Sequence, residues 1–137
     1  MDGGRVHRWV EHTGELELEL SAPTEEGVFA DALDALRELL DEDDEDAPAT
    51  ESQRVSVSAP ERPLLLAEWL GELVFRAEID GFVPRVATDL TLAPDRLEAT
   101  VEGRPGRPVH LVKAVTYHEL RFGRDGDRWR AHVVLDV

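Results

Sequence analysis

The sequence predicts an α+β fold, a two-layer sandwich in which a mostly antiparallel sheet is covered by two helices. Leucines and glutamates alternate strictly from Glu15 to Leu20, which is typical of a strand with one face on a core and the other in water. Two later segments carry apolar residues at three- and four-residue spacing, which indicates amphipathic helices. Residues 113–137 hold two alternating runs separated by a Gly- and Asp-rich turn, which predicts a hairpin.

The size and composition of the chain indicate one globular domain over residues 1–137. That length can bury one core and is too short for two domains of ordinary size. No apolar run approaches the roughly 18 residues of a membrane span, and the N-terminus lacks the apolar core of a signal peptide. We therefore expect a cytoplasmic protein. The absence of cysteine excludes disulfides, thiolate metal sites and cysteine nucleophiles.

The net charge of −15 at pH 7 is large for this length and restricts the partners to be expected. Binding to nucleic-acid phosphates depends on clustered Lys and Arg, so we expect no direct nucleic-acid binding and no association with a membrane. A cation or a basic protein would suit the charge. A solvated acidic surface is the simpler explanation. Arginine is used almost throughout in place of lysine, which occurs only as Lys113; genome composition or adaptation to high salt would explain this bias.

The N-terminal part is predicted to form two strands and a helix. Residues 5–10 and Glu15–Leu20 are the strands, with a turn between them. Capping hydroxyls, a proline and two glutamates mark the start of a helix over Thr24–Leu40. Six acidic residues follow at 41–46 and oppose the helix dipole, so we expect a mobile loop there. Its pattern lacks the spacing and glycine of a calcium loop.

The remaining chain is predicted to hold one strand, the second helix and four more strands. Asp80-Gly81 ends the second helix, because glycine suits the left-handed position after a helix. The predicted strand is 53–59, the helix is 64–79, and the later strands are 84–92, 96–102, 110–115 continuing to 122, and 129–137.

Motifs of known enzyme classes are absent from the sequence. No two histidines have the helical spacing of a zinc site, and the glycine-rich segment 103–108 lacks the residues of a phosphate loop. The serines lie outside any nucleophile elbow. His12 and His118 are the histidines we consider for a functional role. From the residues alone, the sequence indicates no more than a small acidic α+β domain.

Three carboxylates are of interest if the two ends of the chain are neighbours. Glu15 lies at the turn into the second strand, and Asp136 and the terminal carboxylate of Val137 end the last strand. Such groups repel one another unless a cation lies between them, and calcium accepts several oxygens in mixed geometry. Spacing alone does not show that they converge.

Four segments resemble the archease family, and together they extend over nearly the whole chain. Residues 113–118, KAVTYH, are similar to the family's signature, and residues 134–137, VLDV, resemble its aliphatic-Asp-aliphatic ending. Residues 11–13, EHT, and 69–73, WLGEL, resemble its N-terminal and second-helix motifs.

The resemblance implies a role that the residues alone do not. Archeases are protein cofactors of the RNA-splicing ligase that joins a 2′,3′-cyclic phosphate or 3′-phosphate end to a 5′-hydroxyl, using GTP and manganese. They promote its guanylylation and repeated turnover in tRNA splicing and are not themselves catalysts, so the resemblance implies that this protein is not an enzyme. Family members bind a divalent cation, typically calcium. The family's ligands fall on Glu15, Asp136 and Val137 here. We expect His12, Lys113 and His118 to support the site or contact the partner.

This sequence departs from the family pattern at two positions and leaves two other functions open. Glu15 replaces the usual aspartate and is one methylene longer, which calcium tolerates. Glu17 replaces a glycine, and we expect it to be merely solvated. One alternative is a small metal-dependent phosphohydrolase, with Glu15 and Asp136 as ligands and His12 or His118 as base. The other is a chaperone-like modulator of an RNA methyltransferase.

Overall fold

The computed structural model describes residues 4–41 and 48–137, and these form seven strands and two helices. The helices are α1 (Glu25–Leu40) and α2 (Arg62–Ile79). The strands are β1 (Val6–His12), β2 (Glu15–Ala22), β3 (Glu51–Ser58), β4 (Phe82–Ala93), β5 (Arg96–Pro105), β6 (Ala114–Asp125) and β7 (Arg128–Asp136). The predicted element order and the α+β class are confirmed. The predicted acidic loop at 41–46 lies, except for Asp41, outside the described residues.

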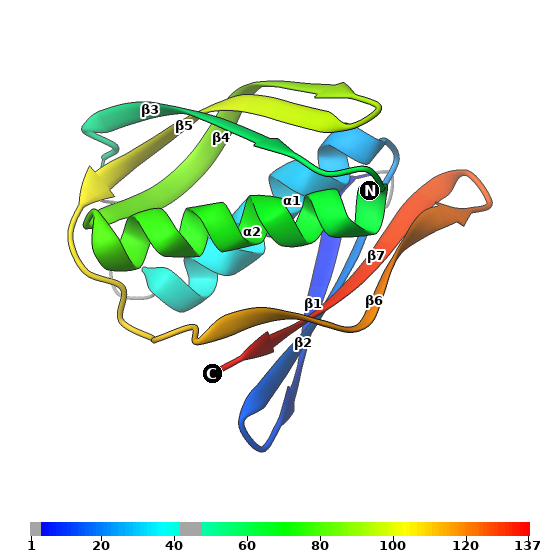
Figure 1. Ribbon diagram of the computed structural model, residues 1–137, viewed down its shortest axis with the longest axis horizontal. Helices are drawn as coiled ribbons and strands as arrows, with labels where there is room; N and C mark the ends of the chain where they lie inside the picture. The colour runs from blue at the N-terminus through cyan, green and yellow to red at the C-terminus, as the bar shows by residue number, and fades with distance from the viewer. Residues whose placement is uncertain (1–3, 42–47) are drawn as a thin grey trace.

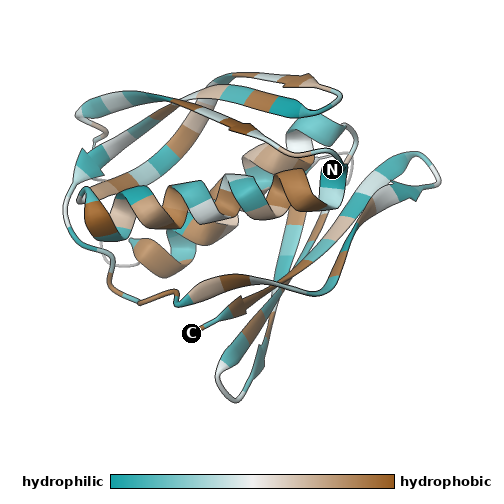
Figure 2. Cartoon of the chain, in the orientation of Figure 1, coloured by the Kyte–Doolittle hydropathy of each residue, from teal (hydrophilic) through white to brown (hydrophobic). Residues whose placement is uncertain are grey.

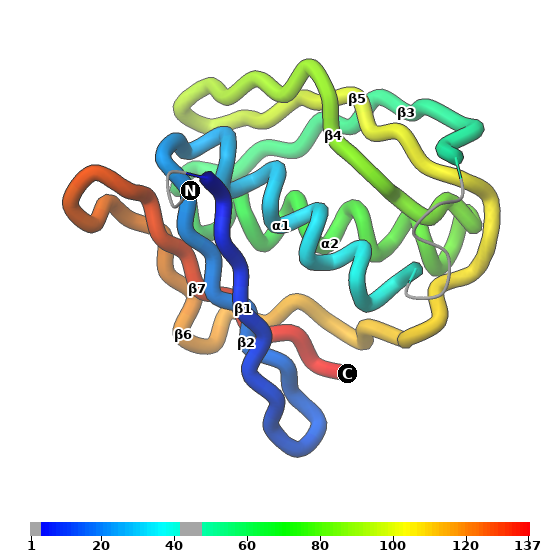
Figure 3. Tube along the Cα trace, turned by 180° about the vertical axis from the view of Figure 1, so that it is seen from behind, coloured from blue at the N-terminus to red at the C-terminus, as the bar shows by residue number. Residues whose placement is uncertain are grey.

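The strands divide into two antiparallel sheets, a division that the sequence pattern did not reveal. Sheet A has the order β1-β2-β7-β6, and sheet B has the order β3-β5-β4. The helices lie between the sheets (Figure 1) and contact strands of both. Figure 3 shows α1 from behind, between the β1–β2 pair and β4. α1 packs on β2 and α2 packs on β6, so the two helices share sheet A rather than both covering β2.

The helices form where their sequence signals predict them. The Thr24 side chain accepts a hydrogen bond from the backbone N–H of Gly27 at 3.0 Å, which caps α1. The stripe of α1, including the fully buried Phe29 and Leu33, faces the core. Trp69 on α2 donates its indole N–H to the Phe29 carbonyl at 2.9 Å, which joins the helices at a buried point.

Alternation in β2 separates the core from an outer face of sheet A. Leu18 and Leu20 are buried, and Glu17 and Glu19 point to the opposite side. Figure 2 shows this alternation of hydrophilic and hydrophobic residues along the strands of both sheets. The outer face, turned away from the helices, carries the polar residues that form the candidate site.

Two sequence predictions are wrong in detail. Residues 110–113 are not part of a strand, and β6 begins at Ala114. Asp41 is not part of a mobile loop: it ends α1, its side chain is 1 % exposed, and it is paired with Arg104 and, at 3.6 Å, with Arg85. Its charge is balanced by arginines from sheet B, which are remote in sequence and therefore invisible to a local pattern.

Candidate functional site: paired carboxylates at the end of sheet A

Strand register brings the front of the chain and its last residues together. β2 and β7 are antiparallel neighbours in sheet A, and Glu15 and Asp136 are direct partners across that pair. The inward residues of β7 are buried in the core, so alternation places Asp136 on the outer face with Glu15. Directly opposed residues on adjacent strands have Cβ atoms about 5 Å apart. The two carboxylates are therefore neighbours on one surface.

Backbone hydrogen bonds fix the end of β7 on both sides. The N–H of Val137 donates to the Gly14 carbonyl at 3.0 Å, which ties the last residue to the β1–β2 turn. The N–H of Lys113 donates to the Asp136 carbonyl at 2.7 Å. Gly14 has φ of +76°, a left-handed conformation that favours glycine in the turn before Glu15. Figure 1 shows the C-terminus beside the segment that leads into β6.

Neither carboxylate is neutralised by the described part of the chain. Glu15 and Asp136 are both partly exposed, and neither side chain makes a hydrogen bond or ion pair with a described residue. Opposed like charges destabilise a strand pair. The donor set, two carboxylates and a terminal carboxylate, consists of the oxygen ligands that calcium prefers. Within residues 4–41 and 48–137, no group of three or more His, Asp or Glu side chains is arranged to hold a metal ion.

Glu17 is a hydrogen-bonding centre, which corrects the expectation that it is merely solvated. One of its carboxylate oxygens bonds Nε2 of His12, and the other bonds Nε2 of His132 at 2.8 Å. Nδ1 of His132 bonds the Glu119 carbonyl, also at 2.8 Å. Each ring nitrogen of His132 therefore lies within hydrogen-bond distance of an oxygen. Sequence reasoning missed Glu17 and His132, because a period-two pattern shows which face a residue occupies but not its partner.

These hydrogen bonds change the acidity of Glu17. The ring of His132, and next that of His12, stabilises the charged carboxylate, so the pKa of Glu17 lies below its usual value. Glu17 therefore stays ionised beside Glu15. His12 is the strand partner of Glu15, so the network of Glu17, His12 and His132 borders the paired carboxylates directly.

His118 lies apart from the paired carboxylates. It belongs to an irregular stretch of β6, where the register with β7 shifts between Thr116 and Arg121 and Glu119 adopts φ of +50°. The His118 ring is 65 % exposed and lies 3.1 Å from the Glu119 carboxylate. The structure thus groups His12 and the Lys113 backbone with Glu15, Asp136 and Val137. His118 is linked to them only through Glu119 and His132.

A cavity of about 410 Å³ lies at the same end of sheet A, on the side that faces the helices, since Leu39 of α1 and Leu16 of β2 line it. Val137, which follows β7, meets there the end of β1 and the segment that precedes β6. Its lining residues are Glu11, His12, Leu16, Leu39, His110, Leu111 and Val137.

Comparison with known proteins identifies the family. Residues 7–137 match the model of the archease protein family (MTH1598/TM1083). The chain belongs to the archease family. A protein archease of Methanopyrus kandleri is 31 % identical over 93 % of this chain and 96 % of its own length. A "Probable protein archease" of Mycobacterium tuberculosis is 33 % identical over 96 % of this chain and 74 % of its own length.

Solved archease-family structures have the same fold. The solution structure of protein 1598 from Methanobacterium thermoautotrophicum matches the whole chain with a TM-score of 0.74 at 25 % identity. The crystal structure of a Thermotoga maritima protein, described as an archease and possible chaperone, matches 96 % of this chain with a TM-score of 0.66 at 23 % identity. The names of these relatives are not those of enzymes. Neither α1 nor α2, the helices of the described chain, combines the length and apolar content needed to cross a bilayer.

Proposed function

We propose that this archease is a cytoplasmic protein cofactor of a GTP- and manganese-dependent RNA-splicing ligase, and that it promotes guanylylation and repeated turnover of that enzyme in tRNA splicing and RNA repair. Membership of the archease family supports this role. The observation that carries it is the register that pairs Glu15 with Asp136, because it gives the end of sheet A a concentrated negative charge. A basic region around the ligase's active site is the complementary surface.

The oxygen donors at this edge are of the kind that calcium prefers, and the terminal carboxylate would complete the set. Glu15 and Asp136 would supply side-chain oxygens, and Val137 would supply its terminal carboxylate. The Gly14 and Lys113 hydrogen bonds hold the end of β7 in place for that purpose. When bound, calcium neutralises most of the repulsion between the carboxylates, and the edge keeps a net negative charge because three carboxylates carry one charge more than the ion. The longer side chain of Glu15 is compatible with the variable geometry of calcium.

The remaining candidate residues would orient the edge or contact the ligase. His12 holds Glu17 on one side of the paired carboxylates. The Lys113 side chain is exposed beside the end of β7, where it can meet an acidic group of the partner. His118 is exposed on the irregular part of β6 and belongs to the same outer face only indirectly.

The test is a guanylylation assay with a cognate ligase. Asp136→Asn removes one charge from the pair and should abolish most of the stimulation. Glu68→Gln removes the same charge from the exposed face of α2, far from the end of β7, and should leave the stimulation intact. Neither substitution changes a residue of the core, and thermal unfolding checks that both variants are folded. Full stimulation by Asp136→Asn would reject the assigned site.

A chaperone role has one specific observation in its favour, the description of the Thermotoga maritima relative as a possible chaperone. In that case the purified chain would suppress aggregation of an RNA methyltransferase and copurify with it instead of with a ligase. A metal-dependent phosphohydrolase would show hydrolysis of a phosphate ester that persists through repurification and disappears in Asp136→Asn. Copurification with a ligase, without such hydrolysis, is the result we expect.

A further inference from the structure

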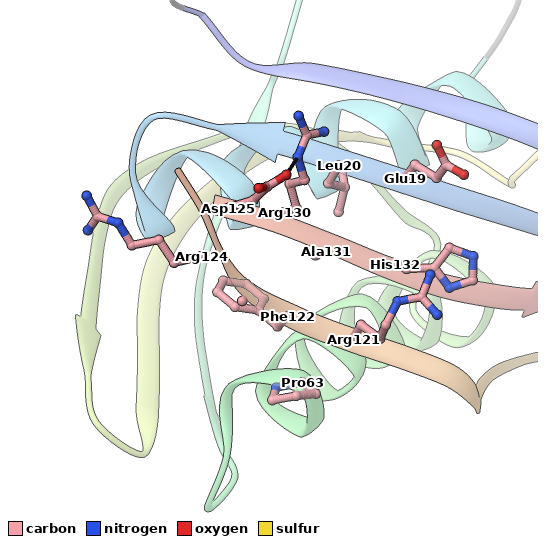
Figure 4. Close-up of a pocket in the computed structure, with 11 residues that line it drawn as sticks. Glu19, Leu20, Pro63, Arg121, Phe122, Arg124, Asp125, Arg130, Ala131 and His132 are labelled. Atoms are coloured by element: carbon pink, nitrogen blue, oxygen red, sulfur yellow. Dashed lines mark hydrogen bonds and ion pairs between the residues drawn. The ribbon is translucent and has the colours of Figure 1, made fainter. Parts of the chain in front are cut away.

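A second hollow lies on the outer face of sheet A, at the far end of β6 and β7 from the paired carboxylates. Gly123 on β6 is the strand partner of Arg130, and Arg121 is the strand partner of His132. A Cβ built on Gly123 would meet no atom within 4 Å, so the space above this residue is open. It forms part of a cavity of about 580 Å³ (Figure 4).

This end of the hairpin is basic although the protein is acidic. Residues 121–130 contain four arginines and two aspartates, against a net charge of −15 for the whole chain. Three of these arginines, Arg121, Arg124 and Arg130, line the cavity. A cluster of guanidinium groups in such a chain is unexpected for a surface that serves only solubility.

The acids near the hollow are already paired. Glu19 is held by Arg8 at 2.9 Å, and Asp125 is held by Nε of Arg130 at 2.5 Å (Figure 4). Within the described chain, Arg121 makes no hydrogen bond, and its one ion pair, with Glu119, is 3.6 Å long. The side chains of Arg121 and Arg130 are 64 % and 58 % exposed. The N–H groups of Arg121 and the terminal N–H groups of Arg130 therefore remain available to donate hydrogen bonds to a ligand.

We propose that this hollow binds the phosphate group of a mononucleotide. Arginine donates paired hydrogen bonds that match phosphate oxygens. Gly123 leaves the space that the phosphate requires between Arg121 and Arg130. The volume is in the range of small-molecule sites and exceeds what inorganic phosphate fills, and the apolar residues Phe122 and Pro63 also line the cavity. The net charge of the protein opposes a long polyanion, which favours a single nucleotide over a strand of RNA.

The proposal does not depend on the ligase and is tested on the purified chain. Isothermal titration calorimetry with AMP should show saturable binding at one site. Arg121→Gln and Gly123→Val should each weaken it by about tenfold or more, the first by removing a charged donor and the second by filling the space. Asp125→Asn should strengthen it, because a negative charge is removed beside Arg130.

The matched control is Arg96→Gln, which removes the same charge from an exposed position on β5 of sheet B. It should leave AMP binding unchanged. Inorganic phosphate should bind at the same site and more weakly than AMP, and a five-nucleotide RNA should bind no better than AMP. Absence of saturable AMP binding, equal weakening by Arg96→Gln, or tighter binding of the RNA would each overturn the proposal.

Discussion

Replacing His7 by glutamine should destabilise the protein in a strongly pH-dependent way. His7 on β1 bonds Asp31 of α1 at 3.0 Å through Nδ1 and Glu38 at 2.8 Å through Nε2. Asp31 is 4 % exposed, and one of its oxygens is buried without a hydrogen-bond partner. The hydrogen bond to Asp31 is the main reason that the pKa of His7 rises from 6.5 to about 9, although burial of the ring opposes the rise.

The magnitude follows from the difference between the folded and unfolded pKa values. A rise from 6.5 to about 9 corresponds to about 3 kcal/mol, at roughly 1.4 kcal/mol per pKa unit. Because the folded pKa is the higher one, this contribution is fully present below pH 6.5 and is lost as the pH rises through about 9. The His7 side chain is 19 % exposed, so solvent screens the interaction little.

The assay is urea unfolding of the wild type and of His7→Gln at about pH 6 and about pH 10. We expect a difference in unfolding free energy of about 3 kcal/mol at the lower pH and a much smaller one at the higher pH. His118→Gln, the same substitution at an exposed ring, should change stability little at either pH. If the difference between His7→Gln and the wild type is the same at both pH values, the ion pair with Asp31 does not stabilise the fold.

Three further results are expected from the same structure. Calcium should raise the melting temperature of the wild type and a chelator should reverse the rise, whereas Glu15→Gln and Asp136→Asn should abolish the response; differential scanning fluorimetry measures this. Asp41→Asn should lower the free energy of unfolding by about 3 kcal/mol, because the buried Arg85 and the partly buried Arg104 lose their charged partner; urea titration of both proteins gives the value. Trp69→Phe should cost about 1–3 kcal/mol in the same titration, since a buried carbonyl of α1 loses its donor.

The sequence predicts the elements of the fold well because their signals are local. The stripe of α1 and the alternation of β2 depend only on residue spacing, and both segments occur within a few residues of their predicted bounds. The division into two sheets depends on which strands pair, and the residues that pair β3 with β5 lie 38 to 52 positions apart in the sequence. Spacing within a strand contains no information on that choice.

The candidate site is predictable only in part, for the same reason. The pairing of Glu15 with Asp136 was required by the proposed metal site but could not be derived from spacing, and the strand register now supplies it. The bonds from Glu17 to His12 and His132 had no sequence signal, since alternation places Glu17 on a solvent-facing side. The start of β6 was missed because the sequence of residues 110–113 resembles a strand, although these residues belong to the connection before β6.

The strand order of sheet A also affects how a nascent chain acquires the candidate site. β7 lies between β2 and β6, so its synthesis must precede assembly of the sheet. Glu17 and His132 are 115 residues apart in sequence. Until the ribosome has produced β7, the edge of β2 that pairs with β7 has no partner and remains open to aggregation. A translation product that stops short of β7 would therefore lack both the acidic edge and the residues that β7 contributes to the core, which makes it a ready target for proteolysis.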